Sequence, residues 1–418
     1  ELLQKQFLPK KFPWQLEFKS DTTPLIRLGA VGLGRAFTVM VPTFALDPRV
    51  QLVAGADPQP EARARFTQDF GGTVYTSLED LLTGAQVDAV YLATPVDGHV
   101  EQIRVLAEAG IHVLMEKPMA LSMAGCLEIS AIAKQAGIHL LIGHSHSFDM
   151  PYLKTRELIK GGTLGRVRMM TALNYTDFMY RPRRPDELDT ARGGGVVYSQ
   201  AAHQIDILRL LGGGQVTSVR AMTGAWDTER NTEGAYSAFL TFKDGLVATA
   251  VYSGYAHFDS DEFLDWQGEL GVRKNPKAYW SARQNLASLT QDRPENEVKA
   301  ARNYGGPLYQ PADLDEVVAR GHQHFGSIIV SCERADIRPL PYGITIYGDT
   351  QRSHLEVPSP TVPRAEVIDE LVGVLVDGTE ALHSGAWATA TLEVCLGILA
   401  SATSGNDITM SNQCGVPA

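Results

Sequence analysis

The chain has 418 residues, with 37 lysines and arginines against 48 aspartates and glutamates, which gives a net charge of −11. Hydrophobic residues make up 44% and charged residues 20%, which excludes a disordered chain, a collagen and a disulfide-dense miniprotein. The length predicts two or three domains, and the acidic balance argues against nucleic acid as a partner, because phosphate backbones select basic surfaces.

Cysteine spacing and the length of apolar runs predict the cellular compartment of the protein. The four cysteines lie far apart and form no CxxC pair, so we expect reduced thiols rather than a disulfide framework or a zinc site. No apolar run approaches the roughly 18 residues of a membrane span, and residues 1–24 lack the apolar segment of a signal peptide. We therefore expect a cytoplasmic protein without a membrane partner, and residues 1–24 as an N-terminal extension.

Regular alternation of strands and helices begins at Leu25. Near-continuous apolar runs predict buried strands at LIRLGAVGLG, VQLVAGAD, VDAVYLATP, IHVLMEKP and GIHLLIGHS, with helical patterns between them. One of these helices is expected between Asp97, which can cap it, and Gly110. The alternation is typical of a doubly wound parallel sheet, so residues 25–147 are predicted to form a Rossmann dinucleotide-binding domain.

The pattern changes after about Phe148. Longer, half-polar strands such as VRMMTALNYTDF, AYSAFLTFKDG and LVATAVYSGYA predict a second α/β domain over residues 148–418, with a large, mostly antiparallel open sheet. Residues 259–320 are charged, rich in proline and asparagine and weakly periodic. We expect this segment to be an insertion or a lid.

A glycine motif directly follows the first predicted strand. Gly29, Gly32 and Gly34 fit a turn that lets backbone N–H groups approach a pyrophosphate, although the third fingerprint position holds Phe37. Asp57 closes the next strand, where a carboxylate accepts hydrogen bonds from ribose hydroxyls and repels a 2′-phosphate. No arginine stands beside it, so the pattern favours NAD over NADP. The alternative is a glycine turn that serves packing alone, with Asp57 as a cap.

The tripeptide Glu116-Lys117-Pro118 closes another predicted strand. Ligands of an open parallel sheet bind beyond the carboxyl ends of its strands, so Lys117, anchored by the proline, is well placed to contact a substrate. The alternative is a surface lysine on a turn.

Four segments of the chain carry a family resemblance. GAVGLGRA, ATPVDGHVEQI, GIHVLMEKPMA and GGGVVYSQAAHQIDILRLLGG resemble, in this order, the glucose–fructose oxidoreductase, inositol dehydrogenase and rhizopine-catabolism (Gfo/Idh/MocA) family. The resemblance implies that residues 148–418 bind the substrate and that the open sheet makes the contacts of a homodimer or homotetramer. It also implies Lys117 in catalysis and His203 as the acid/base histidine.

A narrower resemblance lies within this family. The segments GHSHSFDMP, YRPRRPDEL and GGGVVYSQAAHQID are most similar to 4,5-dihydro-4,5-dihydroxyphthalate dehydrogenases, the dihydrodiol enzymes of phthalate breakdown.

Further cofactor contacts are expected around the glycine motif and at the ends of the later strands. The predicted residues are Arg35, Ala36, Thr94, Pro95, His99 and Glu116.

Ser199, His203 and Asp206 share one stripe of a predicted helix, because their spacings are four and three residues. A histidine near its reference pKa takes a hydroxyl proton as hydride leaves carbon. Many family members carry aspartate at the position of Ser199. This departure either weakens a His–Asp pair or means that another group takes the role of the aspartate. Ser199 itself is expected to contact the substrate. The alternatives are a buried core histidine at 203 and a structural Asp206 that holds the helix to the turn at residues 193–195.

Two histidines, His144 and His146, leave the GIHLLIGHS strand at its carboxyl end. Side chains at i and i+2 of an extended strand share a face, so both are expected to contact substrate oxygens. His322 and His324 repeat the spacing. A metal is not predicted, because no third ligand follows in a recognisable pattern.

Arg181, Arg183 and Arg184 lie on a proline-stiffened loop. Arginine binds carboxylates bidentately, so these residues are predicted to bind an anionic substrate. The alternative, weighted equally, is a solvated loop or ion pairs with the acidic residues that follow it.

These features together favour an NAD-dependent dehydrogenase that oxidises a secondary alcohol of a polar cyclic substrate, either anionic or polyhydroxylated. Under the narrower resemblance the substrate is phthalate cis-4,5-dihydrodiol, which gives 4,5-dihydroxyphthalate. One alternative is a sugar or inositol dehydrogenase on the same scaffold. The other is a non-catalytic dinucleotide-binding sensor.

Overall fold

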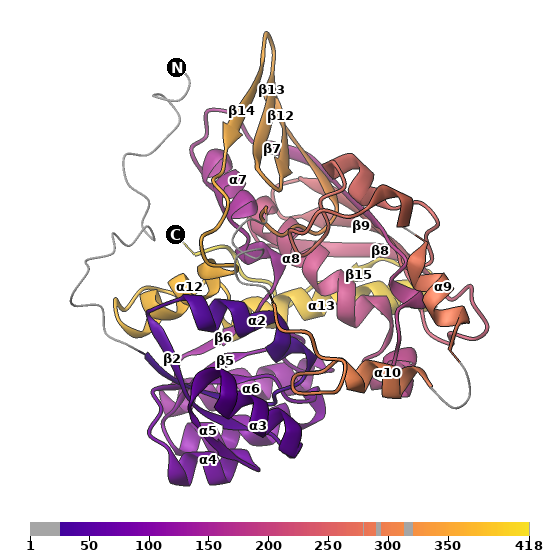
Figure 1. Ribbon diagram of the computed structural model, residues 1–418. Coiled ribbons are helices and arrows are strands. Elements are labelled where there is room, and N and C mark those ends of the chain that lie inside the picture. Colours follow the sequence, from indigo (N-terminus) through magenta and orange to yellow (C-terminus); the bar gives the residue numbers. More distant parts are fainter. Residues whose placement is uncertain (1–25, 279, 290–293, 313–320, 418) are drawn as a thin grey trace.

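The computed structural model describes residues 26–278, 280–289, 294–312 and 321–417, and the predicted extension over residues 1–24 lies outside this part of the chain. The architecture consists of two β-sheets with helices packed against them, joined by loops (Figure 1).

The first sheet has six parallel strands in the order β3-β2-β1-β4-β5-β6. The predicted doubly wound parallel sheet is therefore confirmed. Its strands are β1 (Ile26–Val31), β2 (Val50–Ala56), β3 (Thr73–Tyr75), β4 (Ala89–Leu92), β5 (His112–Met115) and β6 (Leu140–Ile142). The connecting helices are α2 (Arg35–Leu46), α3 (Pro60–Phe70), α4 (Leu78–Gly84), α5 (His99–Glu108) and α6 (Met123–Ala136).

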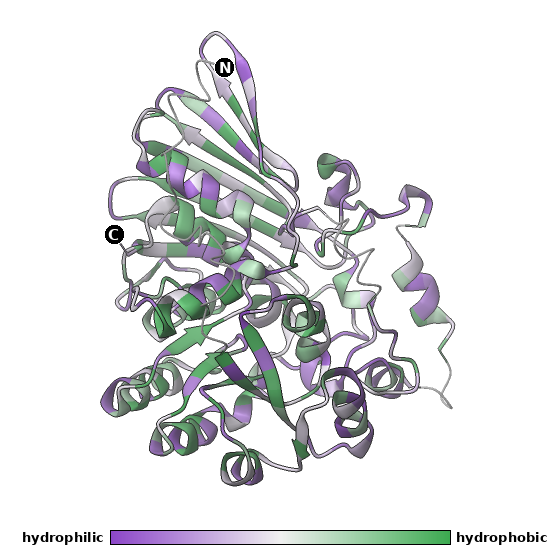
Figure 2. Cartoon of the chain, turned by 60° about the vertical axis from the view of Figure 1, so that its left-hand side comes forward, coloured by the Kyte–Doolittle hydropathy of each residue, from purple (hydrophilic) through white to green (hydrophobic). Residues whose placement is uncertain are grey.

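Both faces of this sheet are covered, which explains why its strands read as continuous apolar runs. In β4, Ala89 and Tyr91 join the hydrophobic cluster of α2 and α3, whereas Val90 and Leu92 join the cluster of α5 and α6 on the other face. The hydropathy colouring shows hydrophobic strands at the centre and helices that are hydrophilic on their outer sides (Figure 2).

The second sheet has nine strands in the order β14-β13-β12-β11-β7-β10-β9-β8-β15. All its pairings are antiparallel except that of β7 with β10, which confirms the predicted mostly antiparallel sheet. Its strands are β7 (Val167–Tyr175), β8 (Val216–Gly224), β9 (Ala235–Phe242), β10 (Val247–Ser253), β11 (Ser327–Cys332), β12 (Ala335–Leu340), β13 (Gly343–Gly348), β14 (Arg352–Glu356) and β15 (Ile408–Thr409).

Helices cover only one face of the second sheet. They are α7 (Met150–Lys160), α8 (Ala202–Gly212) and α13 (Gly385–Ser404), while α12 (Ala365–Leu375) packs against the first sheet. On the opposite face, Met169, Met222, Phe239 and Ile329 are 50%, 63%, 43% and 41% exposed. The second sheet therefore presents an apolar face that no described element covers.

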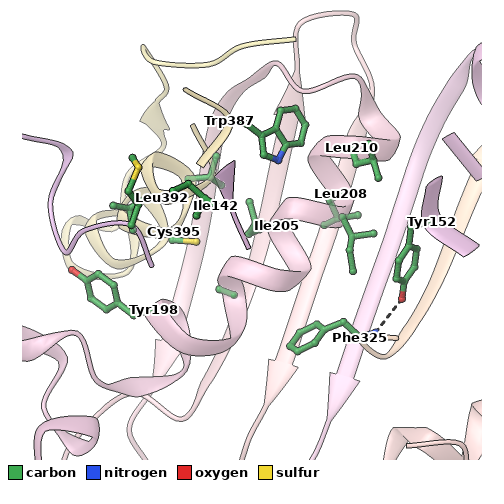
Figure 3. Close-up of a cluster of buried hydrophobic side chains, with 14 of the residues drawn as sticks. Ile142, Tyr152, Tyr198, Ile205, Leu208, Leu210, Phe325, Trp387, Leu392 and Cys395 are labelled. Carbon is green, nitrogen blue, oxygen red and sulfur yellow. Dashed lines mark hydrogen bonds between the residues drawn. The ribbon is translucent and has the colours of Figure 1, made fainter. Parts of the chain in front are cut away.

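Helix α13 runs between the two sheets (Figure 1), and it is long and apolar enough to cross a membrane by length and composition. The sequence analysis found no such run. Of its most apolar window, 67% is buried inside the protein. Figure 3 shows Trp387, Leu392 and Cys395 of α13 in the same cluster as Ile205 and Leu208 of α8, so α13 packs as a core helix.

The segment predicted as an insertion or lid contains the short helices α9 (Ser281–Ala287) and α10 (Glu295–Ala301). Just beyond α10, the Tyr304 ring lies 4.9 Å from the Phe37 ring of α2, and its hydroxyl donates to Asp69 of α3 at 2.7 Å. This part of the segment therefore lies against the helices of the first sheet. Lys299 and Asn303 of the same segment line a cleft at the edge of that sheet.

Candidate active site

A cleft of about 750 Å³ lies beyond the carboxyl ends of β1, β2, β4 and β5. It brings together most of the residues that the sequence singled out. Those that line it are Gly32, Gly34, Arg35, Ala36, Asp57, Thr94, Pro95, His99, Glu116, Lys117, Arg183, Arg184 and Ser199.

The glycine turn between β1 and α2 leaves room for a ligand. Gly32 has a φ of 86°, and a Cβ there would lie 2.6 Å from the carbonyl oxygen of Ala93. A Cβ at Gly34 would meet nothing within 4 Å, and no side chain caps the first turn of α2. Open space beside the N-terminus of α2 is what a pyrophosphate needs, so these residues fit a dinucleotide.

Gly29 does not line the cleft. It lies within β1, and a Cβ there would meet Leu81, Val87 and Val90 at 3.3–3.4 Å. Its predicted contact with the cofactor is corrected to a packing role, because the missing side chain lets α4 and β4 approach β1.

The Asp57 carboxylate lies at the end of β2 and also braces the turn. Its two oxygens accept hydrogen bonds from the backbone N–H groups of Leu33 and Gln59, both at 2.8 Å. Arg63 of α3 donates to the carbonyl oxygens of Asp57 and Pro58 at 2.7 and 2.8 Å. Arg63 was not predicted beside Asp57, because only the helical turn of α3 brings it back to that position.

Two further expected cofactor contacts are held by hydrogen bonds within the protein. The Thr94 hydroxyl donates to Gln102 at 2.6 Å. His99 is 2% exposed, and its Nδ1 lies 3.0 Å from the carbonyl oxygen of Met119. Burial lowers the pKa of His99, so it packs as a neutral ring beside the loop after β4.

Lys117 projects into the cleft from the end of β5. Its Nζ donates to the backbone carbonyl of Ser199 at 3.1 Å. Burial lowers its pKa, against the opposing effect of the Glu116 carboxylate. Glu116 in turn accepts a hydrogen bond of 2.7 Å from the hydroxyl of Tyr91. A desolvated ammonium group of this kind binds strongly to an oxygen that gains negative charge.

His203 is 7% exposed, and its Nδ1 has no hydrogen-bond partner among the described residues. The ring lies 4.9 Å from the His146 ring and 5.2 Å from the Phe325 ring. Burial is the main reason that its pKa lies well below the ordinary value, and the charges of Lys117 and His146 add to the effect. His203 is therefore neutral and able to accept a proton.

A turn of π-helix, Val197–Ala201, precedes α8. Residues 199, 203 and 206 therefore do not share the single α-helical face that their spacing predicts. The Ser199 hydroxyl turns back to the carbonyl oxygen of Gly195 at 2.5 Å, so it does not take the place of an aspartate beside His203. Only the backbone carbonyl of Ser199 reaches Lys117.

Asp206 has different partners from those predicted. Its carboxylate accepts hydrogen bonds from Ser145, Ser147, Trp387 and Thr391, and it does not contact the glycine turn at 193–195. Two of these donors flank His146, so Asp206 fixes the loop that carries His146 against the helix that carries His203.

His144 and His146 bind the same carboxylate. His144 Nε2 lies 3.2 Å and His146 Nδ1 2.7 Å from the two oxygens of Asp149, and His146 Nε2 lies 3.5 Å from Glu269. Burial, the largest influence, would lower the pKa of His146, but Asp149 and Glu269 raise it overall. For His144, burial lowers the pKa to about 3. Neither of these histidines lines the cleft, and His203 does not line it either. His203 is buried behind the lining residues, where the charge of Lys117 and the ring of His146 act on it.

The side chains of Arg181, Arg183 and Arg184 bind to other residues of the protein. Arg184 lies 3.1 Å from Asp186, and Arg181 lies 3.4 Å from Asp177. The Arg183 guanidinium lies over the Phe178 ring at 3.5 Å and donates to the Phe178 carbonyl at 2.6 Å. Ion pairing was the alternative that the sequence left open, and a substrate contact from these arginines stays a prediction.

No group of three or more histidine, cysteine, aspartate or glutamate side chains that could hold a metal ion occurs in the part of the chain that the structure describes. His322 Nε2 lies 2.7 Å from the carbonyl oxygen of Pro358, and His324 Nε2 lies 2.8 Å from that of Gln267.

Besides Arg63, four residues near the site were not predicted from the sequence. Asp149 could have been predicted, because it follows the two histidines closely in GHSHSFDMP. Glu269, which lies beside His146, and Phe325, which lies beside His203, come from distant parts of the chain and carried no local signal. The same holds for Arg364, whose positive charge acts on His203. Figure 3 shows Phe325 close to Tyr152, whose hydroxyl accepts from the Phe325 N–H at 3.0 Å.

The fold and the cleft together define a dinucleotide-binding oxidoreductase. Two family models match, "Oxidoreductase family, NAD-binding Rossmann fold" over residues 26–144 and "GFO/IDH/MocA C-terminal domain" over residues 152–272. The chain belongs to the Gfo/Idh/MocA oxidoreductase family, and its cofactor is NAD.

Individual relatives narrow the comparison. A 1-carboxy-3-chloro-3,4-dihydroxycyclohexa-1,5-diene dehydrogenase of Comamonas testosteroni is 42% identical over 90% of this chain and 94% of its own length. An inositol 2-dehydrogenase of Rhizobium meliloti is 28% identical over 59% of this chain and 74% of its own length. A crystal structure from Bordetella bronchiseptica RB50, assigned as a dehydrogenase, has a TM-score of 0.87 at 40% identity and covers 92% of this chain and 100% of that one.

Proposed function

We propose that this NAD-dependent dehydrogenase oxidises a cis-dihydrodiol of a cyclohexadiene that carries a carboxylate, with phthalate cis-4,5-dihydrodiol as one such substrate. The observation that carries the proposal is a dinucleotide cleft lined by the buried Lys117, whose charge acts on the neutral, unpartnered His203. The ring diol and carboxylate come from the name of the relative that is 42% identical.

Each residue has a distinct part in the proposed reaction. NAD, when bound, supplies the hydride acceptor. Lys117 would stabilise negative charge on the reacting oxygen, and His203, neutral because it is buried, would take the hydroxyl proton. The orphaned Nδ1 of His203 is a polar atom that a ligand hydroxyl would satisfy. The product, a hydroxy-dienone, tautomerises to a catechol, and this aromatisation makes the reaction effectively one-way.

A substrate panel tests the proposal. NADH formation should be measured with cis-dihydrodiols with and without a carboxylate, with inositols and with aldoses. We expect the highest kcat/KM for a dihydrodiol carboxylate. A preference for inositols or aldoses would support the second candidate, a polyol dehydrogenase, which the inositol 2-dehydrogenase relative favours.

Asp57→Ala should reduce the preference for NAD over NADP. The change removes a charged hydrogen-bond acceptor, worth about 1.5–3 kcal/mol, so we expect the ratio of kcat/KM values to fall roughly 10- to 150-fold. Because Arg63 lies beside the site, part of this change should be a gain with NADP, and that gain should disappear in Asp57→Ala/Arg63→Gln. An unchanged preference in Asp57→Ala would show that this carboxylate only braces the turn.

We further propose that the uncovered face of the second sheet joins copies of the chain into a homodimer or homotetramer. The apolar side chains Met169, Met222, Phe239 and Ile329 support this assignment. Phe239→Glu/Ile329→Glu should lower the molar mass measured by light scattering without unfolding the protein. An unchanged mass would remove this face as the interface.

A further inference from the structure

A second cavity, of about 800 Å³, adjoins the cofactor cleft, since Arg35 and Val39 line both. Its walls come from the start of α2, the segment after α10 and the residues just before α12. Three arginines, Arg35, Arg302 and Arg364, line it. Among the described lining residues, Asp149 is the one carboxylate; it is bound to His144 and His146, and its charge also acts on Arg364.

The three arginines have no ion-pair partner among the described residues. Arg35 donates to the Thr38 hydroxyl, and no carboxylate of the residues that the structure describes lies within ion-pair distance of Arg302 or Arg364. Arg181 and Arg184, by contrast, each have an aspartate close by. In a protein with a net charge of −11, an unpaired arginine cluster around a cavity indicates a site for an anion.

Arg364 is the arginine whose position is held most firmly. Its backbone has a φ of 56°, in the left-handed region that residues other than glycine rarely adopt. Its Nε donates to Gln323 at 3.1 Å, and its Nη1 lies 3.7 Å from the Met40 sulfur. These contacts orient the guanidinium and leave Nη2 without an acceptor in the described part of the chain.

Arg364 also acts on the groups in the cleft. Burial is the main cause of the lowered pKa values of Lys117 and His203, and the positive charge of Arg364 contributes to both. The geometry agrees, because Asp149, which lines the second cavity, is bound to His146, and the His146 ring lies 4.9 Å from the His203 ring.

We propose that Arg364 binds the carboxylate of the substrate in the second cavity, while the ring diol lies toward Lys117 and His203. This assignment rests on the proposed function and makes Arg364, rather than the loop with Arg183 and Arg184, the residue that selects anionic substrates. Arg302 adds positive charge to the lining of the cavity. Arg35 stays a predicted cofactor contact.

Arg364→Gln tests the proposal with a matched pair of substrates, a 3,4-dihydroxycyclohexa-1,5-diene-1-carboxylate and the same diol without the carboxylate. We expect kcat/KM for the carboxylate to fall about 30- to 1,000-fold, as for loss of one partner of a desolvated charge pair. The uncharged diol should change less than about threefold, because it forms no ion pair with the guanidinium. Arg364→Lys should restore part of the loss, and Arg352→Gln on β14 is the control.

Binding of the product analogue 3,4-dihydroxybenzoate, measured by calorimetry with NAD present, should weaken in Arg364→Gln, whereas catechol binding should not. The assignment would be overturned if Arg364→Gln lost equal activity with both diols, or lost only NAD affinity. It would also be overturned if the charge-specific loss appeared in Arg183→Gln or Arg184→Gln instead. If the wild-type protein turns over neither diol, the proposed function itself fails. Turnover of both diols without a carboxylate-specific effect of Arg364→Gln refutes this inference alone.

Discussion

Lys117→Met is expected to lower kcat about 10²–10⁴-fold, the range typical of a group that stabilises charge or moves a proton in the transition state. Methionine keeps the length and apolar stem of the side chain but removes the ammonium group. NAD affinity should change little, because the glycine turn follows β1 and Asp57 follows β2, which are two and three strands away from β5 in the sheet. Single-turnover rates and fluorescence titration with NAD separate the two effects.

The pH profile distinguishes a catalytic Lys117 from a structural one. Because burial lowers its pKa below the ordinary 10.5, a requirement for the ammonium form predicts that kcat/KM falls with rising pH before pH 10.5 is reached. This alkaline limb should vanish in Lys117→Met. If the ammonium group served only to hold the Ser199 carbonyl, the variant would lose thermal stability and keep both its turnover and the alkaline limb.

The parts of the site that could be predicted are those whose partners are close in sequence. The glycine turn, Asp57 and Lys117 each follow a strand, and the carboxyl ends of parallel strands necessarily meet at one edge of the sheet. Local spacing therefore placed them in one cleft. The alternation of β4 residues between two clusters likewise follows from a sheet covered on both faces.

Contacts between distant segments could not be predicted in the same way. The spacing of Ser199 and His203 was interpreted as an α-helical stripe, but the π-helical turn sends the Ser199 hydroxyl to Gly195. The partners of the arginine loop include Glu295, which accepts from the Arg183 N–H at 3.0 Å across 112 residues. Arg364 reaches the site because α12 packs against the first sheet, which no pattern around Arg364 indicates.

His203→Ala is expected to lower kcat about 10²–10⁴-fold while leaving NAD affinity nearly unchanged. The ring is the one buried imidazole beside Lys117 whose Nδ1 lacks a partner among the described residues, whereas His144 and His146 are both bound to Asp149. Added imidazole should restore part of the activity, because the truncated side chain leaves space for a free base. His354→Ala on β14 is the matched control.

The sign of the pH dependence follows from the lowered pKa of His203. A general base must be neutral, so kcat/KM should rise with pH through that pKa and level off above it. Since burial and the nearby charges of Lys117 and His146 hold the pKa well below 6.5, the acid limb should lie below pH 6.5, and activity should be flat from there to the alkaline limb of Lys117. The acid limb should disappear in His203→Ala. A limb that persists there would assign the base to another group, with His146 as the nearest imidazole, 4.9 Å away between ring centres.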